Sequence, residues 1–106
     1  MTVAAPQDGT TVVSEFASDP EYRELLEMFA EALPERRRCL SDTFRTGNPE
    51  ELRVLAHQLK GAGGGFGFPE LTNRAASLET ACREGNPQAV ADALEQLLAF
   101  MGRIAI

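Results

Sequence analysis

The chain has 106 residues, a net charge of −6 and a pI near 4.7. This length allows one domain with one modest core, and the acidic balance argues against a nucleic-acid binder, which needs a basic face. No apolar run approaches the ~20 residues of a membrane-spanning helix, and Met1 to Thr11 lacks the basic and apolar regions of a secretory signal. We therefore expect a cytoplasmic protein without membrane contact.

The two cysteines, Cys39 and Cys82, each fall in a helical pattern beside apolar residues. A chain without a secretory signal meets a reducing compartment, where disulfides are rare. We therefore expect both thiols to be reduced and buried as small apolar side chains.

The N-terminal stretch 1–13 contains Pro6, Gly9 and several small polar residues, and it predicts a flexible tail. The folded domain is then expected over 14–106. Ser14 is placed to cap a short helical turn, which would let Phe16 cover one end of the core.

The first long helix is predicted to begin at Asp19-Pro20, a capping side chain followed by a proline at a position that needs no amide. Pro34 interrupts the apolar pattern, which continues to Thr46, and Gly47 ends it. The sequence allows either one helix kinked at Pro34 or two helices that meet there. The stripe consists of Tyr22, Leu25, Leu26, Phe29, Leu33, Leu40 and Phe44.

Three further helices follow, each opened by a residue-plus-proline pair. Asn48-Pro49 starts a helix that Gly67 stops, Phe68-Pro69 starts one that Gly85 stops, and Asn86-Pro87 starts the last. No stretch has the period of two that a half-buried strand requires, and the short loops make consecutive helices antiparallel neighbours. We predict an all-α, antiparallel up-and-down four-helix bundle with a short extra N-terminal helical segment. The expected inner faces are Leu71, Ala75, Leu78 and Cys82, then Val90, Leu94, Leu97, Met101 and Ile104.

His57 is the only histidine, and it lies in the second of these four helices. With about 100° per residue, His57 falls roughly 160° from the middle of the apolar stripe, on the water side. Lys60 and Gly61 follow one turn later and Gly64 two turns later. The imidazole is therefore expected on an exposed face, beside a cation and next to very little side-chain bulk. The stripe is Leu52, Leu55, Ala56, Leu59, Ala62, Gly63 and Phe66.

The glycines after His57 are costly for a helix. Gly61, Gly63, Gly64 and Gly65 together are expected to cost ~2–4 kcal/mol relative to alanine. On the exposed side, Gly61 and Gly64 would admit the surface of a partner, and on the core side Gly63 would let a neighbouring helix approach closely. The alternative is that the glycines fray the helix before Phe66.

Neutral imidazole is an adequate nucleophile, and a histidine with the reference pKa of ~6.5 is mostly neutral in the cytosol. Lys60 can present ammonium protons to the oxygens of a phosphoryl group. A lone exposed histidine is more commonly just solvated, so its lysine and glycine neighbours carry the functional interpretation. A metal site is not expected, since there is no second histidine and the nearest acids, Glu50 and Glu51, lie six or seven residues away.

Across residues 14–104 this pattern resembles the histidine-containing phosphotransfer (HPt) domain of two-component phosphorelays. The helix count and order agree, and the segment Leu33-Pro34-Glu35-Arg36 fits upstream of the histidine. The resemblance rests mainly on His57, Leu59, Lys60, Gly61, the run Gly67-Phe68-Pro69-Glu70-Leu71, and then Ala75, Leu78 and Glu79.

The resemblance implies a phosphoryl carrier. His57 would accept a phosphoryl group from a receiver-domain aspartate and pass it to a receiver aspartate, with Lys60 stabilising the phosphate. Gln58, Gly61 and Gly64 would form the surface on which the receiver docks, called the docking surface below. The expected partners are response-regulator receivers and the receiver domain of a hybrid sensor kinase.

The same resemblance implies no metal or cofactor on this chain, with Mg²⁺ on the receiver, and we expect the protein to be a monomer. We expect neither ATP binding nor autokinase activity, because Gln58 and Ala62 replace the acid and proline that follow the histidine of sensor kinases. The alternative function is a binding-only helical adaptor that docks on receivers without carrying phosphate.

Two surface features allow two interpretations. The basic run Arg36-Arg37-Arg38 is either a solvated helix face or a contact for the acidic rim of a partner. The seam of the last helix is either core or a dimer interface.

Overall fold

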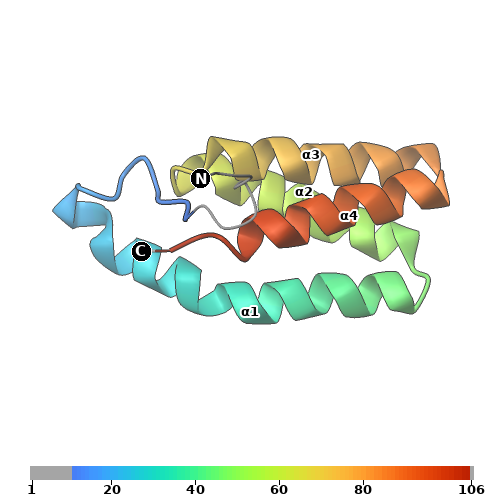
Figure 1. Ribbon diagram of the computed structural model, residues 1–106, viewed down its shortest axis with the longest axis horizontal. Helices are drawn as coiled ribbons and strands as arrows, with labels where there is room; N and C mark the ends of the chain where they lie inside the picture. The colour runs from blue at the N-terminus through green and yellow to red at the C-terminus, as the bar shows by residue number, and fades with distance from the viewer. Residues whose placement is uncertain (1–10, 106) are drawn as a thin grey trace, which may run out of the picture.

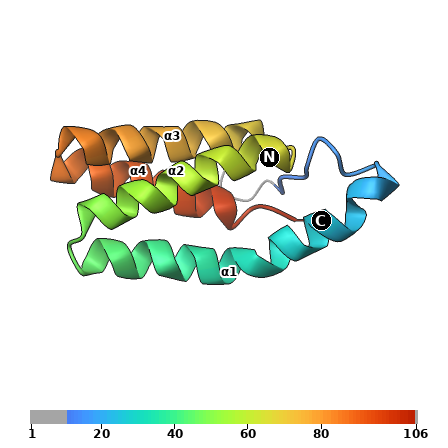
Figure 2. The ribbon, with the colours of Figure 1, turned by 180° about the vertical axis from the view of Figure 1, so that it is seen from behind.

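The computed structural model describes residues 11–105, and over these residues the chain forms the predicted all-α four-helix bundle. Residues 1–10 of the expected tail lie outside the described part. Figure 1 shows α1 on one side of the bundle and α3 with α4 on the other, and Figure 2 shows α2 from behind, between α1 and α3. A short 3₁₀ helix, η2 (Pro20–Tyr22), precedes α1 (Arg23–Arg45), α2 (Pro49–Gly65), α3 (Pro69–Glu84) and α4 (Pro87–Met101).

The helical region before α1 begins where the sequence predicts. The carboxylate of Asp19 accepts a hydrogen bond from the amide of Glu21 at 3.0 Å, and η2 leads directly into α1. Pro34 lies inside one continuous helix, so the alternative of two helices is wrong. Figure 1 shows the two halves of α1 inclined to each other, as expected when a proline interrupts the hydrogen-bond ladder.

The remaining helices start and stop at the predicted signals. The side chain of Asn48 accepts from the amide of Glu51 at 3.1 Å, and that of Asn86 caps α4. Gly67 adopts a φ of 82°, a left-handed conformation that side chains disfavour, so it turns the chain between α2 and α3. Because α2 continues through Gly65, the glycines do not fray it before Phe66.

The apolar seam of α4 belongs to the core. Val90, Leu94, Leu97 and Met101 are buried within the core of this single chain, which confirms the core interpretation of this seam. Ile104 lies beyond the end of α4, where it is half-buried and forms a parallel bridge with Val12.

The segment before η2 is bonded to the end of α2. Ser14 Oγ accepts from the amide of Phe16 at 2.9 Å, as predicted, and also donates to the carbonyl of Phe66 at 2.6 Å. The amide of Glu15 donates to the carbonyl of Gly67 at 2.9 Å. Phe16 is half-buried and packs against the core. This segment therefore covers the junction between α2 and α3.

The two cysteines have different environments. Both are free, and Cys82 is buried, but Cys39 is exposed, so the expectation that both thiols are buried is wrong for Cys39. Leu40 takes the inward position on α1 and leaves Cys39 at the edge of the groove between α1 and α2. Burial raises the pKa of the Cys82 thiol, which therefore stays protonated near neutral pH.

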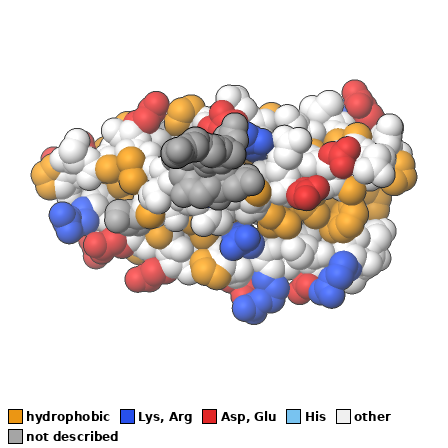
Figure 3. Space-filling model, viewed as in Figure 1, with side chains coloured by type: hydrophobic (Ala, Val, Ile, Leu, Met, Phe, Trp, Pro, Cys, Tyr) orange, Lys and Arg blue, Asp and Glu red, His pale blue; other side chains and the backbone are white. Residues whose placement is uncertain are grey.

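Apolar side chains also gather at the end of the bundle where α1 ends and α4 begins, as Figure 3 shows. A cavity of about 280 Å³ opens there, with Phe44, Leu52, Cys82 and Val90 among its lining residues. Across residues 11–105, the helices are all too short or too polar to cross a membrane.

Candidate functional site

The imidazole of His57 stands on the outer face of α2, as the helical projection predicts. Its side chain is 63% exposed, whereas Ala56 and Leu59 beside it are buried in the core. The helix therefore presents the ring to solvent while its opposite face is packed into the core.

A close approach of α3 to α2 brings further side chains to the ring. Gly63 is buried, and a Cβ placed on it would lie 2.7 Å from the amide nitrogen of Thr72 and 3.0 Å from the carbonyl oxygen of Phe68. Such distances are shorter than any ordinary contact, so only glycine allows α3 to lie this close. The expected packing role of Gly63 is thereby confirmed.

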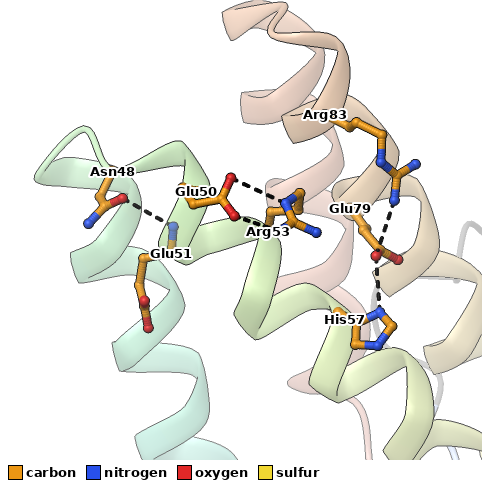
Figure 4. Close-up of polar contacts among 7 residues, drawn as sticks. All are labelled: Asn48, Glu50, Glu51, Arg53, His57, Glu79 and Arg83. Carbon is orange, nitrogen blue, oxygen red and sulfur yellow. Dashed lines mark hydrogen bonds and ion pairs between the residues drawn. The ribbon is translucent and has the colours of Figure 1, made fainter.

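Glu79 on α3 lies opposite His57. Its side chain is only 5% exposed, and its Oε2 atom is 3.0 Å from Nδ1 of His57 (Figure 4). Its other oxygen, Oε1, is 2.7 Å from Nζ of Lys60, and Nη2 of Arg83 lies 3.2 Å from Oε2. One buried carboxylate therefore joins three basic side chains.

The charge of Glu79 follows from these contacts. The Lys60 ammonium, hydrogen-bonded to the carboxylate, holds the pKa of Glu79 below its usual range, although burial acts to raise it, and the His57 hydrogen bond lowers it further. Glu79 is therefore ionised near neutral pH and can only accept hydrogen bonds.

This charge determines the tautomer of the neutral imidazole. Because Oε2 of Glu79 has no proton to donate, Nδ1 of His57 must carry the hydrogen of their shared bond. The lone pair is then on Nε2, the ring nitrogen that Figure 4 shows pointing away from Glu79. The geometry thus provides an exposed nucleophilic nitrogen, Nε2, on an imidazole ring whose tautomer is fixed by a buried carboxylate.

The helix surface next to His57 carries little side-chain bulk. A Cβ placed on Gly61 or Gly64 would meet no atom within 4 Å, and both glycines are exposed, as is Gln58. Gln58 also borders a cavity of about 340 Å³ between α1 and α2, together with Cys39 and Leu55. The three residues of the expected docking surface therefore lie on the accessible side of α2.

The sequence predicts Lys60 beside the histidine, and the structure places it there with its ammonium group bound to Glu79. The contribution of Glu79 as an ion-pair partner was missed, as was that of Arg83. Glu79 follows Leu78 and lies four residues after Ala75, next to the inner face of α3. A carboxylate beside buried positions is a signal that it pairs with cations on the facing helix.

In the basic run on α1, Arg36 and Arg38 contact residues of their own helix. The guanidinium of Arg36 lies 5.9 Å from the centroid of the Phe29 ring, and Arg38 pairs with Glu35 at 2.9 Å. These contacts favour the interpretation as a solvated helix face. Within residues 11–105, no group of three or more histidine, cysteine, aspartate or glutamate side chains could hold a metal ion.

Comparison with known proteins identifies one family. The Hpt domain profile matches residues 24–105, which include nearly all of α1 and the whole of α2, α3 and α4. Searches among curated proteins and solved structures return no match.

Proposed function

The chain belongs to the Hpt domain family, whose members are phosphotransfer carriers of two-component systems rather than kinases, and on this premise we propose that His57 is the phosphoryl acceptor. In this proposal it receives the group from the aspartyl phosphate of a receiver domain and passes it to a receiver aspartate. The observation that carries the proposal is the contact between Nδ1 of the exposed imidazole and Oε2 of buried Glu79.

The reacting atom is Nε2. Its lone pair forms a bond to phosphorus while the bond from phosphorus to the aspartyl oxygen breaks, and the electron pair of that bond leaves with the carboxylate. The ring then carries both the phosphoryl group and the proton on Nδ1, and so it is positively charged. The ionised Glu79, 3.0 Å from Nδ1, stabilises this charge in the product and in the transition state that leads to it. The return step reverses these bond changes.

Lys60 contributes a mobile positive charge. Its ammonium is on Oε1 of Glu79 in the unphosphorylated protein, and its side chain is 36% exposed. From this position it can turn toward the oxygens of the incoming phosphoryl group and stabilise the charge that develops on them. The chain is proposed to need no cofactor of its own, and the receiver is expected to bring Mg²⁺.

The partners follow from the chemistry and from the family, which interacts with receiver domains. We propose that response-regulator receivers, and the receiver domain of a hybrid sensor kinase, dock over Gln58, Gly61 and Gly64 on a monomer of this chain. The absence of side chains at the two glycines would allow the acidic pocket of the receiver to reach Nε2. We propose that this protein acts together with these receivers in the cytoplasm.

The test uses a receiver domain labelled with ³²P on its aspartate. Wild-type protein should take up label that is labile to acid and stable to base, as expected of phosphohistidine, and His57→Gln should take up none. Circular dichroism should show equal helicity for the two, since His57 is exposed, and only a small drop in melting temperature from loss of the hydrogen bond to Glu79. Label on the His57→Gln variant would contradict the assignment, and a stable complex without any label on wild type would favour the binding-only adaptor.

A further inference from the structure

The two oxygens of Glu79 have different partners. Oε1 contacts the Lys60 ammonium at 2.7 Å. Oε2 is shared by Nδ1 of His57 at 3.0 Å and Nη2 of Arg83 at 3.2 Å. The atom that fixes the imidazole therefore has a cation of its own, distinct from the one that the phosphoryl group would attract.

In the proposed function, the Lys60 ammonium binds two anions in turn, first the Glu79 carboxylate and then the phosphoryl group. When its ammonium turns to the phosphoryl oxygens, Oε1 of Glu79 loses its closest cation. The Glu79 side chain is 5% exposed, so water can replace that cation only poorly. A buried carboxylate without a partner is strongly unfavourable, and it would be driven to take up a proton or to move.

Arg83 is placed to prevent this. It lies four residues after Glu79 on the same helix, the order in which an acid and a base stabilise each other best. Figure 4 shows Arg83 and His57 approaching the carboxylate from opposite sides. Because Arg83 and Glu79 are both on α3, their contact does not depend on the position of the Lys60 side chain on α2.

The other arginine near this carboxylate is already engaged. Arg53 on α2 is hydrogen-bonded to Glu50, with 3.3 Å between its Nε atom and Oε1 of that residue. Figure 4 shows this pair side by side, away from the dashed contacts of Glu79. Arg83 is therefore the better placed of the two to take over from Lys60.

Resting on the proposed function, we propose that Arg83 is a positioning residue that keeps Glu79 ionised and hydrogen-bonded to Nδ1 of His57 while Lys60 is turned to the phosphoryl group. Arg83 neither touches the phosphoryl group nor exchanges a proton. Its effect is to hold the proton on Nδ1, and thereby to keep the positive charge of the phosphorylated ring against a carboxylate.

The contact lengths predict in which state the loss of Arg83 changes the hydrogen bond between Glu79 and His57. In the unphosphorylated protein, Lys60 at 2.7 Å is the main cause of the lowered pKa of Glu79, followed by His57. Arg83 is farther away, at 3.2 Å, and its side chain is 59% exposed. Loss of Arg83 should therefore change little while Lys60 stays on Glu79, and much once Lys60 is absent or turned away.

The test reads the imidazole directly by ¹⁵N NMR of histidine-labelled protein, using the Nδ1–H signal. Four proteins are compared in the unphosphorylated state: wild type, Lys60→Ala, Arg83→Gln and the double variant. Each single variant should keep the Nδ1–H signal, and the double variant should lose it to a mixture of tautomers. Arg45→Gln on α1 is the matched control, because it removes another exposed arginine from an ion pair, the one with Asp42.

A second arm uses the phosphorylated state. Phosphoramidate, a small donor that needs no receiver, loads Nε2 with release of ammonia. The Nδ1–H signal should then persist in wild type and in Arg45→Gln but be lost or strongly broadened in Arg83→Gln. Arg83→Lys, which keeps the charge, should restore it. If the double variant does not fold, this arm on the single variant decides the question.

Several outcomes would overturn the inference. They are an Nδ1–H signal that survives in phosphorylated Arg83→Gln, a signal that is lost equally in both states, or a double variant that behaves like Lys60→Ala. A purely structural role would lower the melting temperature without this dependence on state. Neither arm uses a receiver, so a failure of receiver-dependent labelling would contradict the proposed function and leave this test intact.

Discussion

Thr72 on α3 donates its hydroxyl proton to the main-chain carbonyl of Lys60 on α2, with 2.9 Å between the two oxygens. The side chain of the same lysine is bound to Glu79, two turns further along α3. Lys60 is thus held by α3 through both its backbone and its ammonium group. The relative position of the two helices is therefore fixed within one turn of the point where His57 meets Glu79.

Gly63 and Gly64 on α2 provide a matched pair of substitutions, one at a position packed against α3 and one at a position open to solvent. Gly63→Ala should destabilise the protein by roughly 1–3 kcal/mol, because the new methyl group would collide with the backbone of α3. Gly64→Ala should stabilise it by about 0.5–1 kcal/mol, because alanine is the better helix former and nothing lies within 4 Å of its Cβ. Urea unfolding of both variants measures the two free energies, and equal effects would contradict the close approach at Gly63.

Glu79→Gln should slow phosphoryl transfer while His57 stays in place. An amide can donate as well as accept, so it no longer forces the proton onto Nδ1, and it cannot stabilise the charged ring. Loss of a hydrogen bond to a charged group corresponds to roughly tenfold or more in rate. Single-turnover transfer from a labelled receiver measures the rate, and ¹⁵N NMR should show both imidazole tautomers. A variant with wild-type rate and a single tautomer would contradict the role of Glu79.

Stability should depend on pH through Glu79. Its pKa is lowered in the folded protein from an ordinary value of 4.5, so the folded state favours the ionised carboxylate. The resulting stabilisation is fully present above that value and is lost as the pH falls through the lower folded pKa. The difference in unfolding free energy between wild type and Glu79→Gln should therefore be larger at pH 7 than at a pH well below 4.5. A difference that is the same at both pH values would exclude this linkage.

Lys60→Ala should reduce both transfer and stability. An unpaired surface lysine would contribute within ~0.5 kcal/mol, but loss of the contact with a buried carboxylate should cost about 1 kcal/mol. Transfer should slow because no ammonium group remains to meet the phosphoryl oxygens. Arg45→Ala, in an exposed pair with Asp42, is the control and should leave both quantities unchanged. An unaltered transfer rate would show that Lys60 serves only Glu79.

Gly61→Gln should have effects of opposite sign on folding and on docking. The free protein should gain about 0.5–1 kcal/mol, because the position is open and glycine is a poor helix former. Receiver binding and receiver-dependent transfer should fall sharply, since the new side chain projects from the docking surface. Loading of His57 by phosphoramidate should be unaffected, which separates docking from chemistry. Normal transfer in this variant would place the receiver elsewhere.

The helices, their ends and the exposure of His57 could be predicted because each depends on residues within one or two turns. Asn48 caps its own helix, and the position of His57 on α2 follows from a local apolar period. The partnership with Glu79 could not be derived in this way. It joins residues 22 positions apart, and it depends on how closely α3 approaches, which Gly63 permits.

Two smaller differences have local causes. Cys39 has apolar neighbours in the sequence, but Leu40 takes the inward position and leaves the thiol at the edge of a groove. From the sequence, Pro34 is compatible with one kinked helix or with two helices. Whether a proline breaks a helix depends on how well the residues before and after it pack against the core. Leu33 and Leu40 are both buried, and this shared burial keeps the helix continuous.

The pairing of Val12 with the segment after α4 has a consequence for connectivity. The amide of Val12 donates to the carbonyl of Arg103 at 2.8 Å, and the amide of Ala105 donates to the carbonyl of Val12 at 2.9 Å. Positions 12 and 105 are therefore adjacent in space, and a short peptide could join them. The groups around the imidazole all belong to the consecutive pair α2 and α3. A circular permutant opened at Gly47 or Gly85 would thus keep that hairpin uncut, since the site depends on one helical hairpin and not on the order in which α1 and α4 are connected to it.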